Sequence, residues 1–172
     1  MQRGNLDLSE AEYFDIIDAK TAELTACSCR LGALYSGAGE QVVEQMTSYG
    51  RSLGIAFQIA DDLLDLVGEE QAAGKSLGTD LEQQKLTLPV IHLLASAAPE
   101  QATRVRSLLQ GGTAARRIAL ARELEASGAL AYARRRAEAF AAQAAADLDC
   151  LPASECRTIL EMLTERVVNR SA

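Results

Sequence analysis

The sequence is poor in aromatic residues and in residues that form strands. Phenylalanine and tyrosine together make up 4% of its 172 residues, tryptophan is absent, and His92 is the single histidine. Runs of valine, isoleucine and threonine, which favour β-strands, are hard to find. Alanine and leucine dominate, and both are good helix formers. We therefore expect an all-α fold, with residues 1–172 forming a single domain.

Positive charge and long apolar runs are also lacking. The net charge is −7 at pH 7, which argues against nonspecific nucleic-acid binding because that needs a basic face. The arginine run 134–136 is interpreted most simply as a solvated helix face, and a phosphate contact is the less favoured alternative. No apolar run reaches about 18 residues, so no membrane span is expected. The polar N-terminus differs from a secretory signal, and the four cysteines favour reduced thiols and a cytoplasmic location.

Caps, prolines and glycines divide the chain into expected helices. Ser9 and Glu12 are typical of a capping box at the start of a helix over 11–35. Four apolar residues of that helix keep a helical period: Phe14, Ile17, Leu24 and Leu31. A second helix is expected over 40–67, followed by a loop over 68–78. The next helix is expected to begin at a cap, Thr87, with Pro89 in its first turn, and to end before Pro99. The remaining helices are expected over 99–109, 113–127 and 129–149 and after Pro152.

The most informative stretch is a group of carboxylates in an otherwise apolar helix, at 54–65. Asp61 and Asp65 lie one above the other on one face, with Asp62 beside them and Gln58 one turn earlier. Partly desolvated carboxylates repel one another, so a cation must balance them. The flanking leucines and isoleucine disfavour the alternative, a solvated acidic face. Oxygen ligands of this kind suit Mg²⁺ shared with phosphate oxygens, which predicts a magnesium–diphosphate site.

A loop that carries a lysine follows this helix. Lys75 lies between Gly74 and Gly78, and Asp80 and Lys85 follow. A lysine on such a loop suits a diphosphate as a mobile point charge, whereas alone it could be an ordinary surface lysine. No Walker A spacing precedes it, so this is not a P-loop.

Together these segments closely resemble the second aspartate-rich region of trans-isoprenyl diphosphate synthases, the polyprenyl synthetase family. Residues 13–17, Lys20-Thr21 and Gly32-Ala33 look like the preceding active-site helix of that family. The resemblance rests on 54–65, Gly74-Lys75, Thr79-Asp80-Leu81 and 85–91, and covers most of residues 4–95. It implies an isoprenoid-synthase-type helical bundle.

The resemblance also implies a reaction and a set of site residues. Family members condense isopentenyl diphosphate with an allylic diphosphate in a Mg²⁺-dependent 1′–4 reaction. The metal ligands would be Asp61, Asp62 and Asp65, the diphosphate partners Lys20 and Lys75, the residues near the reacting carbons Thr21 and Gln58, the isopentenyl pocket Phe57, and the supporting residues Asp80 and Lys85. Gln84 replaces the glycine usual before that lysine.

The family's first aspartate-rich motif is not found in this sequence. The resemblance therefore implies a C-terminal portion whose N-terminal helices are missing, with exposed apolar helix faces and little activity alone. One interpretation is an incomplete synthase. Another is a noncatalytic or half-site subunit that needs a partner with the first motif, and a third is a class I terpene synthase relative. A homodimer is a further family expectation.

Overall fold

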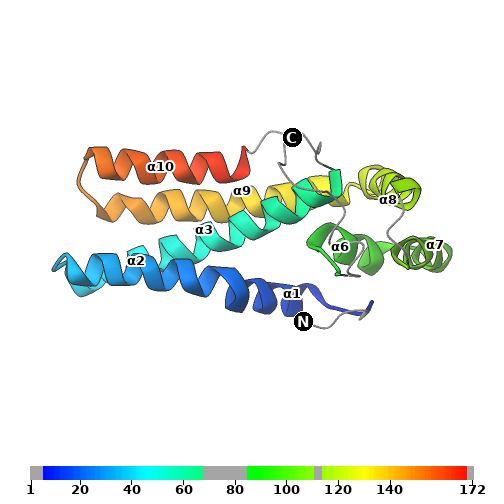
Figure 1. Ribbon diagram of the computed structural model, residues 1–172, viewed down its shortest axis with the longest axis horizontal. Helices are drawn as coiled ribbons and strands as arrows, with labels where there is room; N and C mark the ends of the chain where they lie inside the picture. The colour runs from blue at the N-terminus through cyan, green and yellow to red at the C-terminus, as the bar shows by residue number, and fades with distance from the viewer. Residues whose placement is uncertain (1–5, 68–84, 111–113, 170–172) are drawn as a thin grey trace. The chain divides into compact units, whose positions relative to one another are not determined.

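The structure is a computed structural model that describes residues 6–67, 85–110 and 114–169 (Figure 1). Over these ranges every regular element is a helix and no strand occurs, which confirms the all-α expectation. The expected loop 68–78, with Lys75, Asp80 and Gln84, lies outside the described residues. No helix in the described ranges is long and apolar enough to cross a membrane.

The described residues form two compact units. The first contains residues 6–13, 61–67, 85–110 and 114–135, and the second contains 14–60 and 136–169. The helices that contribute to both are α1 (Glu10–Ile17), α3 (Glu40–Val67) and α9 (Ala129–Asp147). The bounds of α3 agree with the expected helix 40–67. The expected helix 129–149 ends as α9 at Asp147 and continues as a 3₁₀ turn, η2 (Leu148–Cys150).

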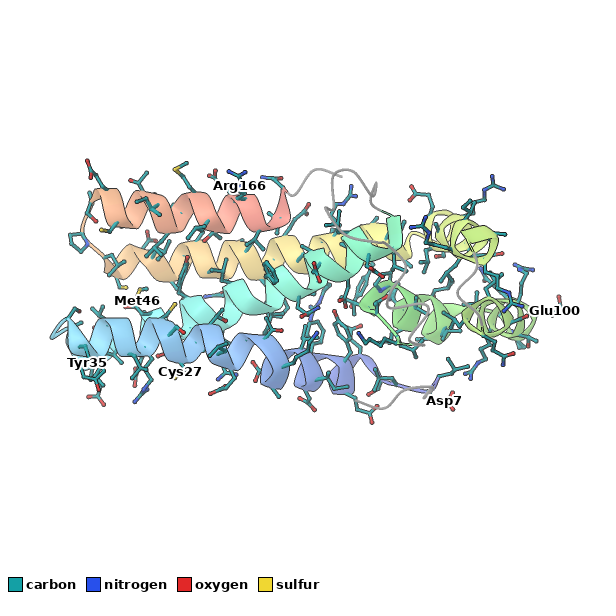
Figure 2. All side chains as sticks on the ribbon, viewed as in Figure 1. Asp7, Cys27, Tyr35, Met46, Glu100 and Arg166 are labelled. Atoms are coloured by element: carbon teal, nitrogen blue, oxygen red, sulfur yellow. The ribbon has the colours of Figure 1, made fainter. Side chains whose placement is uncertain are left out.

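The second unit is a helical bundle whose apolar core is shared by several helices (Figure 1). It contains α2 (Glu23–Tyr35), α10 (Glu155–Val168) and parts of α3 and α9. Its core cluster consists of Ala33, Val43, Met46, Tyr49, Ala144 and Leu148. The Tyr49 hydroxyl donates to the Leu160 carbonyl at 3.2 Å, which ties α3 to α10. Figure 2 shows Met46 pointing in among these helices and Tyr35 pointing away from them.

Two glycines of α3 let the segment at the start of α2 approach closely. A Cβ on Gly50 would lie 2.5 Å from the Thr25 carbonyl oxygen, and a Cβ on Gly54 would lie 2.7 Å from Ala22 Cα. Both contacts are far inside van der Waals distance and involve backbone atoms, which cannot easily move. A spacing of four places both glycines on one face of α3. Their missing side chains allow residues 22–26 to pack directly against the backbone of α3.

The expected helix over 11–35 is interrupted by a π-helical turn, η1 (Asp18–Ala22), between α1 and α2. The Glu23 N–H donates to the Asp18 carbonyl, five residues earlier, so the turn contains one extra residue. No local pattern predicts this turn, because π-turns depend on tertiary contacts rather than on helix propensity.

The extra residue moves the buried face of the helix by one position. Tyr13 and Ile17 are buried before the turn, and Ala22 and Ala26 are buried after it. Leu24, which shares the helical period of Ile17, is 72% exposed.

The first unit packs α6 (Leu88–Ser96), α7 (Pro99–Leu109) and α8 (Ala114–Ala126) against one another. The bounds of α7 are as expected, and α8 ends at Ala126, one residue before the expected end at 127; residue 113 lies outside the described residues. The expected capping box is present at the start of α1. The Ser9 hydroxyl accepts from the Glu12 N–H at 3.2 Å, and the Glu12 carboxylate accepts from the Ser9 N–H at 2.8 Å.

Thr87 occupies the N-cap position of α6, with Pro89 in the first turn as expected, but its side chain makes no capping hydrogen bond. The expectation of a side-chain cap is wrong. A cap side chain normally bonds the N–H of the second or third helical residue, and the second residue here is Pro89, which has none.

Candidate functional site

The aspartates predicted as metal ligands lie near the C-terminal end of α3, in the first unit. Asp62 and Asp65 are 6% and 2% exposed, and Asp61 is half-buried. The Tyr13 hydroxyl donates to Asp62 Oδ2 at 2.8 Å, and Tyr13 is itself 3% exposed. Buried carboxylates require polar partners. This end of α3 therefore holds acidic groups in a protected place and orients at least one of them.

The donor set fits a metal shared with a ligand rather than a closed protein cage. Within the described residues, no group of three or more His, Cys, Asp or Glu side chains is arranged to hold a metal ion. Mg²⁺ is usually bound through one or two carboxylates, with phosphate oxygens and waters in the other positions. The hydrogen bond from Tyr13 to Asp62 is of the kind that orients such a ligand. Oxygen ligands on one helix are compatible with Mg²⁺ of this shared type.

A second polar cluster lies in the second unit and joins η1 to α3. The Thr21 hydroxyl donates to Gln58 Oε1 at 2.9 Å, and the Lys20 ammonium lies 3.4 Å from the same oxygen. Gln58 is 7% exposed, Thr21 is half-buried and Lys20 is exposed. The exposed ammonium of Lys20, next to the neutral polar groups of Thr21 and Gln58, suits the binding of an anion from solution.

Arg51 of α3 braces both ends of the π-turn that carries Lys20 and Thr21. Its guanidinium pairs with Asp18, the first residue of η1, and with Glu23, the first residue of α2. The hydrogen bond with Asp18, followed by that with Glu23, raises the pKa of Arg51 above its already high ordinary value. The helix that provides Gln58 therefore also fixes the turn whose side chains contact it.

A mostly apolar cavity of about 360 Å³ lies beside this cluster. It is lined by Thr21, Thr25, Leu53, Gly54, Phe57, Leu163, Arg166 and Val167. Phe57, expected to line a substrate pocket, is half-buried there. Apolar walls with a few polar groups are typical of small-molecule sites. The cavity can hold an apolar group whose polar end lies near Thr21 or Arg166.

The structure thus brings the predicted site residues together in two groups. Asp61, Asp62 and Asp65 belong to the first unit with the half-buried Lys85, and Lys20, Thr21, Phe57 and Gln58 belong to the second. Lys75 and Asp80 lie outside the described residues.

Sequence reasoning missed the residues that support these groups. Tyr13 was seen only as part of the preceding helix, although a tyrosine among apolar residues signals a buried hydroxyl that needs a partner. The spacing of Gly50 and Gly54, four residues apart within one long helix, signals a close helix approach. Arg51 has no comparable signal, because its partners depend on the π-turn.

The fold is that of the isoprenyl synthases, a class of all-α proteins, because solved structures of that class match this chain closely. A sequence model of the family described as "Polyprenyl synthetase" matches residues 1–124, and the chain belongs to that family. It is 37% identical over 166 residues to a short chain isoprenyl diphosphate synthase of Methanothermobacter thermautotrophicus, covering 96% of this chain and 51% of that protein. It is 34% identical to the octaprenyl diphosphate synthase of Escherichia coli, covering 95% of this chain and 51% of that protein.

A solved structure shares the fold at high similarity. The polyprenyl synthase of Caulobacter crescentus, crystallised with calcium and isoprenyl diphosphate, has a TM-score of 0.89 and 36% identity, covering 100% of this chain and 53% of that one. The chain therefore spans about half the length of the relatives it matches.

Proposed function

We propose that this chain provides one side of the active site of a Mg²⁺-dependent prenyl diphosphate synthase, which condenses isopentenyl diphosphate with an allylic diphosphate. The observation that carries the proposal is the buried pair Asp62 and Asp65, with Tyr13 bonded to Asp62, on the same helix as Gln58. Family membership and the calcium and isoprenyl diphosphate of the Caulobacter crescentus protein support it.

In this proposal Asp61, Asp62 and Asp65 hold Mg²⁺, which when bound neutralises charge on the departing diphosphate. Lys20 and Lys75 pair with diphosphate oxygens, and Asp80 and Lys85 support them. Because Lys20 is exposed at the rim and Gln58 is buried, the ammonium can move to the anion while the amide stays fixed.

The remaining residues act on the carbon skeletons. The carbon–oxygen bond of the allylic diphosphate breaks and releases diphosphate, the isopentenyl double bond forms the new carbon–carbon bond, and the proton lost from the resulting cation passes to the released diphosphate. Thr21 and Gln58, joined by a 2.9 Å hydrogen bond, would lie beside the reacting carbons as preorganised dipoles. Phe57 would cover the isopentenyl group and exclude water from it.

We further propose that the chain alone has little or no condensation activity. It spans about half the length of its relatives, and its sequence carries one aspartate-rich motif where the family uses two facing ones. A partner that carries the first motif would complete the site. This half-site arrangement is the second candidate function, favoured by the exposed apolar side chains of α2, such as Leu24 and Tyr35 at 72% and 84%.

Calorimetric titration with farnesyl diphosphate tests the metal–diphosphate site without requiring turnover. We expect saturable binding with Mg²⁺ that is lost with EDTA. Asp61→Asn and Lys20→Gln should each raise the dissociation constant by about tenfold or more. Asp15→Asn and Arg30→Gln make the same charge changes at exposed positions and should leave binding unchanged. Binding that does not need Mg²⁺, or equal losses in the control variants, would contradict the proposed site.

A separate assay tests the lack of activity. The chain is incubated with Mg²⁺, isopentenyl diphosphate and farnesyl diphosphate, and longer products are sought by chromatography. No product is expected from the chain alone, whereas co-expression with a polypeptide carrying the first aspartate-rich helix should yield product. Robust turnover by the chain alone would overturn the half-site proposal while leaving the metal site intact.

A further inference from the structure

A second cavity, of about 430 Å³, lies within the first unit and contains none of the residues assigned above. It is formed by the end of α3, by α8 and by the start of α9, which can be followed in Figure 1. Its lining combines apolar and cationic side chains, which are Leu66, Arg117, Ile118, Arg122, Leu130 and Arg134.

Cationic groups dominate the polar part of this cavity. Arg117, Arg122 and Arg134 line it, and Glu125 is the single carboxylate among its described lining residues. None of the three arginines makes a hydrogen bond or ion pair with another described residue. Arg104, by contrast, pairs with Glu123 at 2.8 Å. Three guanidinium groups around one cavity repel one another and create a local positive potential on a chain of net charge −7.

Apolar groups form the rest of the lining. Leu66 and Leu130 are 6% and 8% exposed and close its inner side, whereas Ile118 is 53% exposed at its rim. Ile118 and Arg122 are four residues apart on α8, as are Leu130 and Arg134 on α9. Each helix therefore presents one apolar and one cationic side chain on the same face, one turn apart.

We propose that this cavity binds a phosphate-bearing amphiphile. Guanidinium groups bind phosphate oxygens through paired N–H donors and remain charged at all physiological pH values. The phosphate would lie among Arg117, Arg122 and Arg134, and the first carbons of the apolar tail would lie against Leu66, Ile118 and Leu130. Because no carboxylate ligand set is involved, binding needs no metal ion, which distinguishes it from the metal–diphosphate site.

Decyl phosphate, kept below its micelle concentration and in EDTA, is a suitable probe for the intact chain. We expect saturable binding with one site per chain. The double variant Arg117→Gln/Arg134→Gln should raise the dissociation constant at least about tenfold. The matched control is Arg116→Gln/Arg135→Gln, which makes the same charge change at adjacent exposed positions of the same two helices. The control should change affinity by less than about twofold.

A third variant tests the apolar half of the site. Ile118→Ser removes an exposed side chain, so folding is expected to be unaffected. It should weaken the binding of decyl phosphate while leaving the affinity for inorganic phosphate, which has no tail, unchanged. The proposal would be overturned if the chain bound neither decyl phosphate nor phosphatidylglycerol vesicles. It would also be overturned if the two double variants lost affinity equally.

Vesicle sedimentation distinguishes the two sources of such a ligand. Sedimentation with phosphatidylglycerol vesicles but not with phosphatidylcholine vesicles, lost in Arg117→Gln/Arg134→Gln, would assign a lipid headgroup. Binding of decyl phosphate without sedimentation on either vesicle would assign a soluble amphiphile. Both results support the shared chemistry. Sedimentation that persists equally in both double variants counts against it.

Discussion

The hydroxyl of Tyr13 donates to Asp62 Oδ2 at 2.8 Å across 49 residues of sequence, and both side chains are almost fully buried. We expect Tyr13→Phe to lower the free energy of unfolding by about 1.5–3 kcal/mol, because a buried hydrogen bond to a carboxylate is lost. Denaturant titration measures this. Tyr35→Phe, at a position 84% exposed, should have no effect. Equal stability of the two variants would show that the bond contributes nothing.

Gly54→Ala should separate the start of α2 from α3. The added methyl group would lie 2.7 Å from Ala22 Cα, so the backbone must shift, at a cost of about 1–3 kcal/mol. Gly32→Ala is the matched control, since a Cβ there meets nothing within 4 Å. It should stabilise α2 by about 0.5–1 kcal/mol. Thermal unfolding of both variants is the measurement, and stabilisation by Gly54→Ala would disprove close packing.

Arg51→Gln should loosen the π-turn. Because Arg51 and Asp18 are partly exposed, with side chains 39% and 34% accessible, the loss should be only about 1 kcal/mol at low salt. It should shrink as salt screens the charges. Arg30→Gln removes an exposed arginine of α2 and should be neutral. Denaturation at two ionic strengths measures the difference in stability between the unmodified chain and Arg51→Gln. If that difference did not depend on salt, the role of Arg51 would be steric rather than electrostatic.

Acid should weaken the contact between α7 and α8. Arg104, followed by Gln101, lowers the pKa of Glu123 through hydrogen bonds. A lowered folded-state pKa contributes stability that is complete above the unfolded value, about 4.3. That stability is lost as pH falls through the lower folded value. The advantage of the unmodified chain over Glu123→Gln should therefore shrink as the pH falls below the unfolded pKa, and should be lost once the pH is below the lowered folded pKa. Glu125→Gln, the same charge change at an exposed site, is the control.

The exposed apolar side chains of α2 should promote association. Leu24, Leu31, Leu34 and Tyr35 are 72%, 43%, 51% and 84% exposed, in agreement with the expected exposed apolar faces. We expect Leu24→Gln/Leu31→Gln to reduce apolar-dye binding and self-association in sedimentation without loss of stability. Met162→Gln, at a 62% exposed position of α10, is the comparison. A monomeric unmodified chain that binds no dye would contradict this expectation.

Helix boundaries were predictable where local chemistry decides them. Pro99 begins α7 and the Ser9–Glu12 box begins α1 because each satisfies or avoids an N–H at the helix start. Features decided by tertiary contacts were not predictable. Arg136 illustrates this: it belongs to a run expected to face solvent, yet its guanidinium lies 4.9 Å from the ring centroid of Phe14.

The residues of the candidate site could be predicted from the sequence, but the residues that position them could not. Three aspartates in an apolar helix predict a metal site by their chemistry alone. Thr21 and Gln58, which the resemblance put near the reacting carbons, form a hydrogen bond with each other that the sequence did not predict. Tyr13 and Arg51 act through partners distant in sequence. The local pattern around Tyr13 indicates a buried hydroxyl but not its partner, and no local pattern indicates Arg51. The metal-ligand roles themselves stay predictions.

The π-turn makes the surface and the site depend on one inserted residue. Without that residue, Ala22 would follow Ile17 by four positions, and one unbroken α-helix would keep the same buried face. The chain accommodates the extra residue as a local bulge, which carries Thr21 at its contact with α3. If the same residues formed a regular α-helix throughout, the face of Ile17 would continue instead through Leu24 and Leu31, which are exposed in the structure. The bulge thus decides which of two apolar stripes on one helix is buried and which is left available for association.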